Sequence, residues 1–277
     1  MLKTILVHID GGPFQQSRLR AAALLARTHG AHLVGSAATG WTMPRYAALS
    51  DSMGPQVSIG EFEELREAAT RLLDDFVDQA ARLGVQGAEA HLAENASREG
   101  LLLQSRYADL VVLGQEAGRG QAGAERGLAA YLALHGVRPV LIVPDDYQDA
   151  PIPGDALLGW DGSMPALRAI TAALPLLARA GTVHLALVNP DQQSGLQGDE
   201  PGADMARYLA RHGLKVEVAV AHTRAHESEA LMDMARDRHA GLMVTGAFGH
   251  SRYREWLLGG VTRDVLARAP APLLIAH

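Results

Sequence analysis

Three things are missing from this 277-residue sequence, and each absence excludes a class of protein. There is no cysteine, which excludes disulfides, thiolate catalysis and cysteine-based zinc sites together. Basic residues are not in excess, since 25 Lys and Arg stand against 31 Asp and Glu. The sequence therefore lacks the basic field that is typical of nucleic-acid-binding proteins.

Long apolar runs are also missing. No window approaches the roughly 18 apolar residues that would span a bilayer. The apolar run at the N-terminus is too short for a secretory signal and is interrupted by Asp10. We therefore expect a cytoplasmic protein with neither a membrane nor a nucleic-acid partner.

What is present is an alternation of strand-like and helix-like segments. Several of the strand-like runs are unbroken stretches of apolar residues, which predicts a mostly parallel sheet with helices on both faces. A loop containing Trp41, Pro44 and Pro55 is expected before the longest helix. In the first 143 residues we expect strands at 4–9, 32–37, 85–92, 109–113 and 139–143, with helices at 16–28, 61–83 and 97–106.

The same order of segments then occurs a second time. Asp161 follows an apolar run 151 residues after Asp10 does. Gly246 matches Gly114 at an offset of 132, and His184-Leu185 matches His32-Leu33 at 152. The offset falls because the second copy has a shorter connection, 189–211, between its second and third strands. This pattern indicates an internal duplication.

A polar, proline-rich stretch from Pro144 to Asp155 lies between the two copies and indicates a linker. We therefore expect one domain over residues 1–146, a linker over 147–155, and a second domain over 156–277.

The second copy contains a glycine loop between an apolar run and a helix-like segment. Its glycines have the spacing Gly246-x2-Gly249-x9-Gly259, followed directly by Gly260. Glycine lets a backbone approach an anion closely, and the amide groups of a helix N-terminus then face that anion. The loop therefore predicts a phosphate site.

Taken together, these motifs resemble those of the universal stress protein family, in a tandem arrangement. The resemblance is carried by LLGWDGS at 157–163 and by GAFGHSRYREWLLGGVTRDVLARAPAPLLIA at 246–276. It implies two tandem Rossmann-like domains of the adenine nucleotide α-hydrolase type. Each would be an open five-stranded parallel sheet with helices on both faces. It also implies ATP, with or without Mg²⁺, bound over the carboxyl ends of the strands, where open α/β sheets hold ligands.

The resemblance implies a role for each matching residue of the second copy. Asp161 and the backbone of Val188 would contact the adenosine, and the glycine loop with the following helix start would contact the phosphates. Arg252 suits phosphate as a guanidinium fork, although a solvated loop arginine explains it as well. The full predicted nucleotide site is Asp161, Gly162, Ser163, Val188, Gly246, Gly249, His250, Ser251, Arg252, Gly259, Gly260, Val261 and Thr262.

Both copies depart from the family pattern. Gly260 stands where a serine or threonine is usual, and Thr262 would replace that hydroxyl only in part. A neutral hydrogen bond contributes about 1 kcal/mol, so the departure should weaken binding about five-fold. In the first copy Ala117 replaces the second glycine, and Leu128 follows Gly127 where a phosphate donor is needed. We expect the first copy to have lost tight nucleotide binding.

Weaker motifs give alternative sites. Residues 118–123 spell G-x-G-x-x-G, but they begin beyond the strand end that a dinucleotide turn requires. His222 and His226 are four residues apart, as in a helical metal site, but His222 is expected to end a strand. Ser163 is expected to cap a helix, since no nucleophile elbow surrounds it.

The leading hypothesis is an ATP-binding stress-response or regulatory protein with at most weak, incidental ATP hydrolysis. We expect the two copies to pack as an intramolecular pseudo-dimer, because an unpaired last strand at Val140–Val143 would be an exposed edge. A homodimer is a further option. The alternatives are an interaction module that binds no nucleotide and a small-ligand or metal carrier. An adenylating enzyme would need an S-G-G-x-D-S loop, which the sequence lacks.

Overall fold

The computed structural model describes residues 1–53, 59–115, 127–192, 200–247 and 260–277. Within them the strands form one ten-stranded sheet in the order β3-β2-β1-β4-β5-β10-β9-β6-β7-β8. We call the part from β1 to β5 the first half and the part from β6 to β10 the second half. Each half is internally parallel, as predicted.

The first half carries one more helix than the sequence analysis expected in its β2–β3 connection. Its elements are β1 (Thr4–His8), α1 (Gln15–His29), β2 (His32–Ala38), α2 (Met43–Met53), α3 (Ile59–Arg82), β3 (Glu89–Ala93), α4 (Ser97–Ser105), β4 (Leu110–Gly114), α5 (Leu128–His135) and β5 (Val140–Val143).

The second half repeats this order with a shorter connection between its second and third strands. Its elements are β6 (Asp155–Gly159), α6 (Met164–Leu177), β7 (Val183–Val188), a 3-10 turn (Pro190–Gln192), α7 (Ala203–Arg211), β8 (Val216–Ala221), α8 (Glu227–Asp237), β9 (Ala240–Gly246), α9 (Gly260–Arg268) and β10 (Leu273–Ala276).

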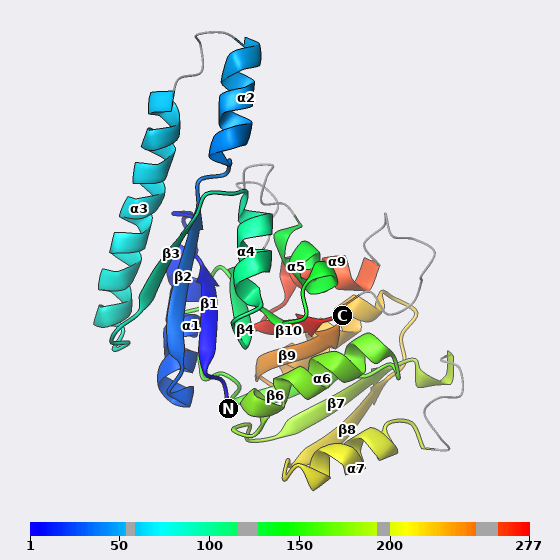
Figure 1. The fold of residues 1–277 in the computed structure, drawn as a ribbon. Helices are drawn as coiled ribbons and strands as arrows, with labels where there is room; N and C mark the ends of the chain where they lie inside the picture. Colours follow the sequence, from blue (N-terminus) through cyan, green and yellow to red (C-terminus); the bar gives the residue numbers. More distant parts are fainter. Residues whose placement is uncertain (54–58, 116–126, 193–199, 248–259) are drawn as a thin grey trace.

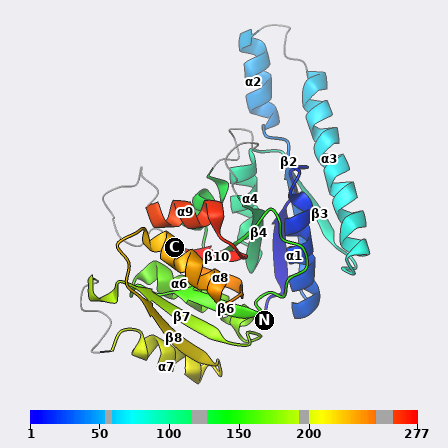
Figure 2. The same cartoon turned by 180° about the vertical axis from the view of Figure 1, so that it is seen from behind.

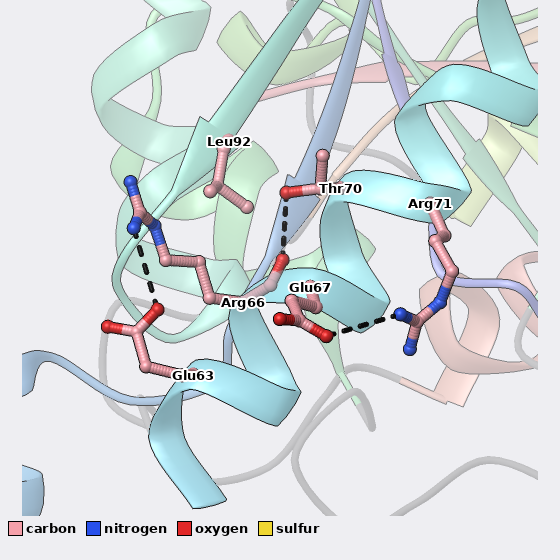
Figure 3. Close-up of a pocket in the computed structure, with 6 residues that line it drawn as sticks. All are labelled: Glu63, Arg66, Glu67, Thr70, Arg71 and Leu92. Carbon is pink, nitrogen blue, oxygen red and sulfur yellow. Dashed lines mark hydrogen bonds and ion pairs between the residues drawn. The ribbon is translucent and has the colours of Figure 1, made fainter. Parts of the chain in front are cut away.

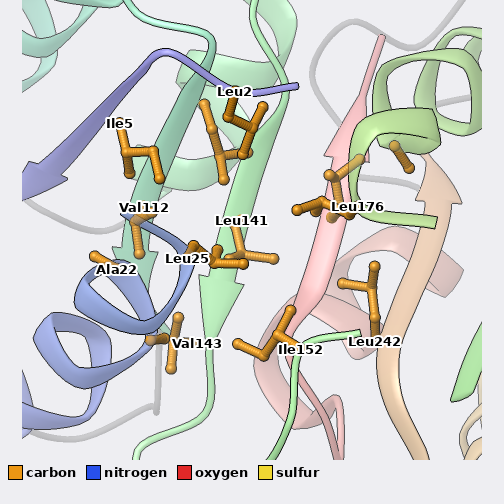
Figure 4. Close-up of a cluster of buried hydrophobic side chains, with 14 of the residues drawn as sticks. Leu2, Ile5, Ala22, Leu25, Val112, Leu141, Val143, Ile152, Leu176 and Leu242 are labelled. Atoms are coloured by element: carbon orange, nitrogen blue, oxygen red, sulfur yellow. The ribbon is translucent and has the colours of Figure 1, made fainter. Parts of the chain in front are cut away.

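The two halves meet where β5 pairs antiparallel with β10. Leu274 lies opposite Leu141 in this register, and all four residues of β5 are buried. Figure 4 shows apolar side chains on both sides of the junction, with Leu25 and Leu141 from the first half near Leu176 from the second. The last strand of the first half is therefore not an exposed edge.

Each face of the sheet has its own apolar layer, and each layer runs through both halves. One layer packs α1, α3, α6 and α7 against the sheet, and the other packs α4, α5, α8 and α9 (Figures 1 and 2). Tyr147 and Ile152, in the segment between β5 and β6, are buried in the first of these layers. That segment is thus packed against the core over part of its length.

Two expectations about the first half were wrong. The stretch with Trp41 and Pro44 was expected to be a loop, but α2 begins at Met43. Proline is tolerated in the first turn of a helix, where its missing N–H has no intrahelical partner, so Pro44 did not exclude a helix. The third strand was expected from Val85, but it begins at Glu89 because Gly84 and Gly87 turn the chain with positive φ.

Hydrogen bonds at the strand ends define which residues of the halves correspond. Ile9 N donates to Ser36 O, and Trp160 N donates to Ala186 O. The first strands therefore match at an offset of 151 and the second strands at 150. The sequence match of His184-Leu185 to His32-Leu33 was off by two residues, because the two histidines are not equivalent: His32 is exposed and His184 is buried.

Figure 1 shows α2 and the adjoining end of α3 projecting away from the sheet. At its other end α3 packs on β2 through Phe76, which is fully buried. A Cβ at Gly35 would lie 2.5 Å from the Phe76 ring, so glycine is what admits this side chain.

We expect Phe76→Ala to lower the free energy of unfolding by about 3–5 kcal/mol, because it leaves a cavity under β2. Denaturant unfolding followed by circular dichroism measures this loss. Phe14→Ala is the matched control, since Phe14 is 48% exposed and its removal should change the midpoint little. Equal losses in the two variants would contradict the assigned packing.

Candidate functional site

In the second half, three predicted site residues lie at the carboxyl ends of neighbouring strands. The strands are adjacent in the order β9-β6-β7, and they are followed or ended by Gly246, Asp161 and Val188 respectively. Leu158 of β6 pairs with Val244 of β9, which sets the ends of these two strands level. The chain leaves β6 toward β7 on one side and returns to β9 on the other. This is the switch point where open α/β sheets form a ligand crevice.

The turn after β6 fixes the Asp161 carboxylate beside the start of α6. Gly162 has φ +76°, a conformation that glycine adopts without strain. Ser163 N donates to Asp161 Oδ1 at 2.9 Å, and Ser163 Oγ accepts from Ala166 N at 3.2 Å. The prediction that Ser163 caps a helix is confirmed, because it is the N-cap of α6. Its hydroxyl is used in this cap.

Gly246 is required by packing at the same place. A Cβ at this position would lie 2.4 Å from Ala166 N, a backbone atom that cannot move aside cheaply. Glycine therefore lets the end of β9 approach the first turn of α6. The structure thus gives Gly246 a packing role beside Asp161.

The helix that follows the glycine loop begins at Gly260, so Gly260, Val261 and Thr262 form its first turn. Among the described residues, no heavy atom lies within 4 Å of the position that a Cβ at Gly260 would take, and Val261 is 37% exposed. The other predicted phosphate-binding residues lie outside the described residues: Gly249, His250, Ser251, Arg252 and Gly259.

Asn189 is a site residue that the sequence analysis missed. It follows β7 with φ +47°, is 6% exposed, and accepts a hydrogen bond from Thr223 N through Oδ1 at 2.8 Å. This bond ties the end of β7 to the loop after β8. A buried asparagine directly after an apolar strand was the signal that could have identified it, because Asn tolerates positive φ better than most residues.

The first half has a different set of polar groups at its corresponding strand ends. Asp10 follows β1 and accepts from Gly12 N at 2.8 Å, in the turn that corresponds to Asp161-Gly162-Ser163. Arg18 of α1 forms an ion pair with Asp10, and both side chains are largely buried. Leu128, expected to crowd a phosphate, is instead a buried residue at the start of α5. Ala117 and the G-x-G-x-x-G stretch lie outside the described residues.

Burial and the adjacent charges shift two pKa values in this cluster. Desolvation, reinforced by the Arg18 guanidinium, lowers the pKa of His8 from its ordinary 6.5 to about 4. Burial opposes ionisation of Asp10, but Arg18, His8 and the Gly12 N–H outweigh it and lower the pKa of Asp10. Asp10 is therefore charged and His8 neutral at pH 7.

Other candidate sites gain little from the structure. His222 lies 3.6 Å from Asp191, whereas His226 precedes α8 as its N-cap. Within the described ranges, no three histidine or acidic side chains are grouped so as to hold a metal ion. In the same part of the chain, no helix combines the length and apolar character needed to cross a membrane.

A surface groove lies between α3 and β3 (Figure 3), and its polar groups interact mainly with one another. Arg66 pairs with Glu63 at 3.6 Å, and Arg71 pairs with Glu67 at 3.5 Å. All four side chains are about half exposed or more, so these ion pairs are solvated and weak. The groove includes Leu92, near the carboxyl end of the edge strand β3, and is separated from the switch point between β1 and β4 by β2.

The fold defines a class: a doubly wound α/β protein of two similar halves, each with a switch point at the carboxyl ends of its strands. Comparison with known proteins makes this class specific. Residues 155–277 match the model of the universal stress protein family. The universal stress protein Slr1230 of Synechocystis is 25% identical, over 99% of this chain and 99% of its own length.

Solved structures show the same two-half fold. A universal stress protein from Archaeoglobus fulgidus covers 99% of this chain and 95% of its own, with a TM-score of 0.75 at 16% identity. A functionally unknown protein, PA1789 from Pseudomonas aeruginosa, covers 99% and 92% with a TM-score of 0.61 at 15% identity. The second half thus matches the universal stress protein family by sequence, and the whole chain is similar to universal stress proteins along its full length.

The buried His8 gives a prediction about pH. Because its pKa is lower in the folded chain than in the unfolded one, the unfolded chain binds more protons between pH 6.5 and 4. We expect the free energy of unfolding to fall as the pH is lowered through this window. The Asp10 contribution should be lost only below its ordinary pKa of 3.8.

Urea unfolding at half-unit intervals of pH measures the slope. His8→Asn should flatten it between pH 6.5 and 4, whereas His135→Asn, at an exposed position on α5, should leave it unchanged. An unaltered slope in His8→Asn would refute the role of His8.

Proposed function

We propose that the second half binds an adenine nucleotide, ATP in the first place, and that the chain uses this binding in a regulatory stress response in the cytoplasm. The observation that carries the proposal is the juxtaposition of Asp161 and Gly246 at the switch point of the second half. One supplies a fixed carboxylate, and the other lets strand and helix close beneath the crevice.

The adenosine would lie over the ends of β6 and β7. A carboxylate held by a backbone N–H is a good acceptor for ribose hydroxyls, and Asp161 is held in this way by Ser163 N. The adenine would lie beside the backbone of Val188. The bond between Asn189 and Thr223 N supports this idea, because it fixes the chain that follows Val188.

The phosphates would lie toward the start of α9. A helix N-terminus presents unpaired N–H groups and a positive dipole end, both of which suit an anion. Gly260 begins the first turn of α9, and its lack of a Cβ would let a phosphate approach the backbone closely. A Mg²⁺ ion, if it accompanies ATP, would be bound through the phosphates, as is usual for this ion.

One observation favours a second function, an interaction module that binds no nucleotide. Gly260 supplies no hydroxyl that could donate a hydrogen bond to a phosphate. A calorimetric titration with ATP and adenosine distinguishes the two functions, because an interaction module would bind neither ligand.

Calorimetric titration with ATP tests the nucleotide proposal. Asp161→Ala should weaken binding about 10- to 100-fold, since a hydrogen bond to a charged group contributes about 1.5–3 kcal/mol. Asp161→Asn keeps an acceptor for Ser163 N and should lose less. The matched control is Asp204→Ala, which removes an exposed carboxylate paired with Arg207 on α7. Absence of binding at millimolar ATP would exclude the proposal, and equal affinity in Asp161→Ala would move the site elsewhere.

The space at Gly260 gives a second prediction. Gly260→Ser restores the hydroxyl that the family pattern has at this position, and no atom of the described residues lies within 4 Å of the added Cβ. We expect the affinity for ATP to rise about five-fold, which is one neutral hydrogen bond. Gly260→Ala is the control for backbone stiffening alone. Adenosine affinity should not change in either variant, and a gain for adenosine equal to that for ATP would contradict the phosphate assignment.

A further inference from the structure

Arg18 is a buried arginine at the switch point of the first half. In that half β1 lies between β2 and β4, so the crevice of the doubly wound unit opens between the ends of β1 and β4. Asp10 follows β1, and Gly114 ends β4. Arg18 reaches this place from α1 and is 3% exposed.

The guanidinium reaches both strands that flank the switch point, with two nitrogens toward the end of β1 and one toward the end of β4. Nε donates to the carbonyl oxygen of His8, the last residue of β1, at 2.8 Å. Nη2 donates to Asp10 Oδ1 in the ion pair described above. Nη1 lies 2.8 Å from the position that a Cβ at Gly114 would take. The arginine therefore connects the ends of both strands that flank the crevice.

The second half has no such side chain at the corresponding position. The Asx turns at Asp10 and Asp161 align the halves at an offset of 151, which matches Arg18 with Ala169. Ala169 is fully buried. Instead of facing an arginine, Gly246 at the end of β9 faces the backbone of Ala166 directly.

We propose that the Arg18 side chain occupies the position of a ligand in the first half. Its guanidinium binds Asp10 and covers Gly114, whose counterparts Asp161 and Gly246 would bind nucleotide in the second half. The chain therefore has one nucleotide site, and Arg18 is the residue that determines this. The inference rests on the proposed function of the second half for the identity of the ligand.

The buried ion pair with Asp10 explains why the Arg18 side chain stays at this position. Removing one partner of a buried ion pair leaves an uncompensated charge, which is strongly unfavourable. A nucleotide entering the first crevice would have to separate Arg18 from Asp10 before it could use the Asp10 carboxylate. Two of the three guanidinium nitrogens are bonded within the chain, Nε to His8 O and Nη2 to Asp10.

The test opens the crevice and uses adenosine, which needs no phosphate loop. The variant Arg18→Ala is made in an Asp161→Ala background, so that the second site contributes little, and is titrated by calorimetry. Adenosine binding should rise from no detectable site to one per chain. The matched control is Arg27→Ala, an arginine on the same helix that donates to Leu83 O at the surface; this variant should gain nothing. If folded Arg18→Ala binds no adenosine at millimolar concentration, the proposal is overturned.

A second measurement needs no variant and covers the case in which Arg18→Ala does not fold. The unmodified protein is photolabelled with 8-azidoadenosine and digested. Label confined to peptides of residues 156–277 is expected, and label on peptides of residues 1–146 overturns the proposal. Failure of the proposed function is distinguishable, because the unmodified protein then takes up no label while Arg18→Ala still gains its site.

Discussion

The pairing of β5 with β10 is the interaction on which the rest of this structure depends. Without it each half would end in a short, fully apolar strand with unpaired backbone groups, an arrangement that invites aggregation. With it, the two parallel sheets become one, and both apolar layers continue through the junction. Because the pairing is antiparallel, the carboxyl ends of the strands point in opposite directions in the two halves. The switch points of the two halves therefore lie at opposite ends of the strands of a single sheet.

The same local turn serves both crevices, yet the two differ in what the neighbouring helix contributes. Asp10 and Asp161 each follow a first strand and each accept a backbone N–H two residues later. In the second half the helix contributes backbone and small residues, with a serine cap. In the first half it contributes Arg18, together with the burial that keeps His8 neutral. Among the described residues, the two strand-end turns thus differ mainly in what α1 and α6 contribute.

Much of the fold followed from sequence because its signals are local. Unbroken apolar runs marked the strands, glycine and proline marked the turns, and the repeat fixed the topology. The failures also have physical causes. The helix α2 was missed because Pro44 lies in its first turn, and β3 was begun too early because an edge strand has a weak apolar pattern. Arg18 was missed because burial is a tertiary property. A signal existed, since Arg18 shares the helical spacing of Ala22, Leu25 and His29 on the buried face of α1.

The covalent link between the halves has an evolutionary consequence. In a symmetric dimer of identical single-domain chains, any residue placed in one crevice is placed in both. An arginine that closed one crevice would close the other and abolish the ligand response. Once two copies are joined through the segment between β5 and β6, each can mutate alone. Duplication followed by fusion would thus allow one half to lose its ligand site and keep only a structural role, while the other half keeps its site.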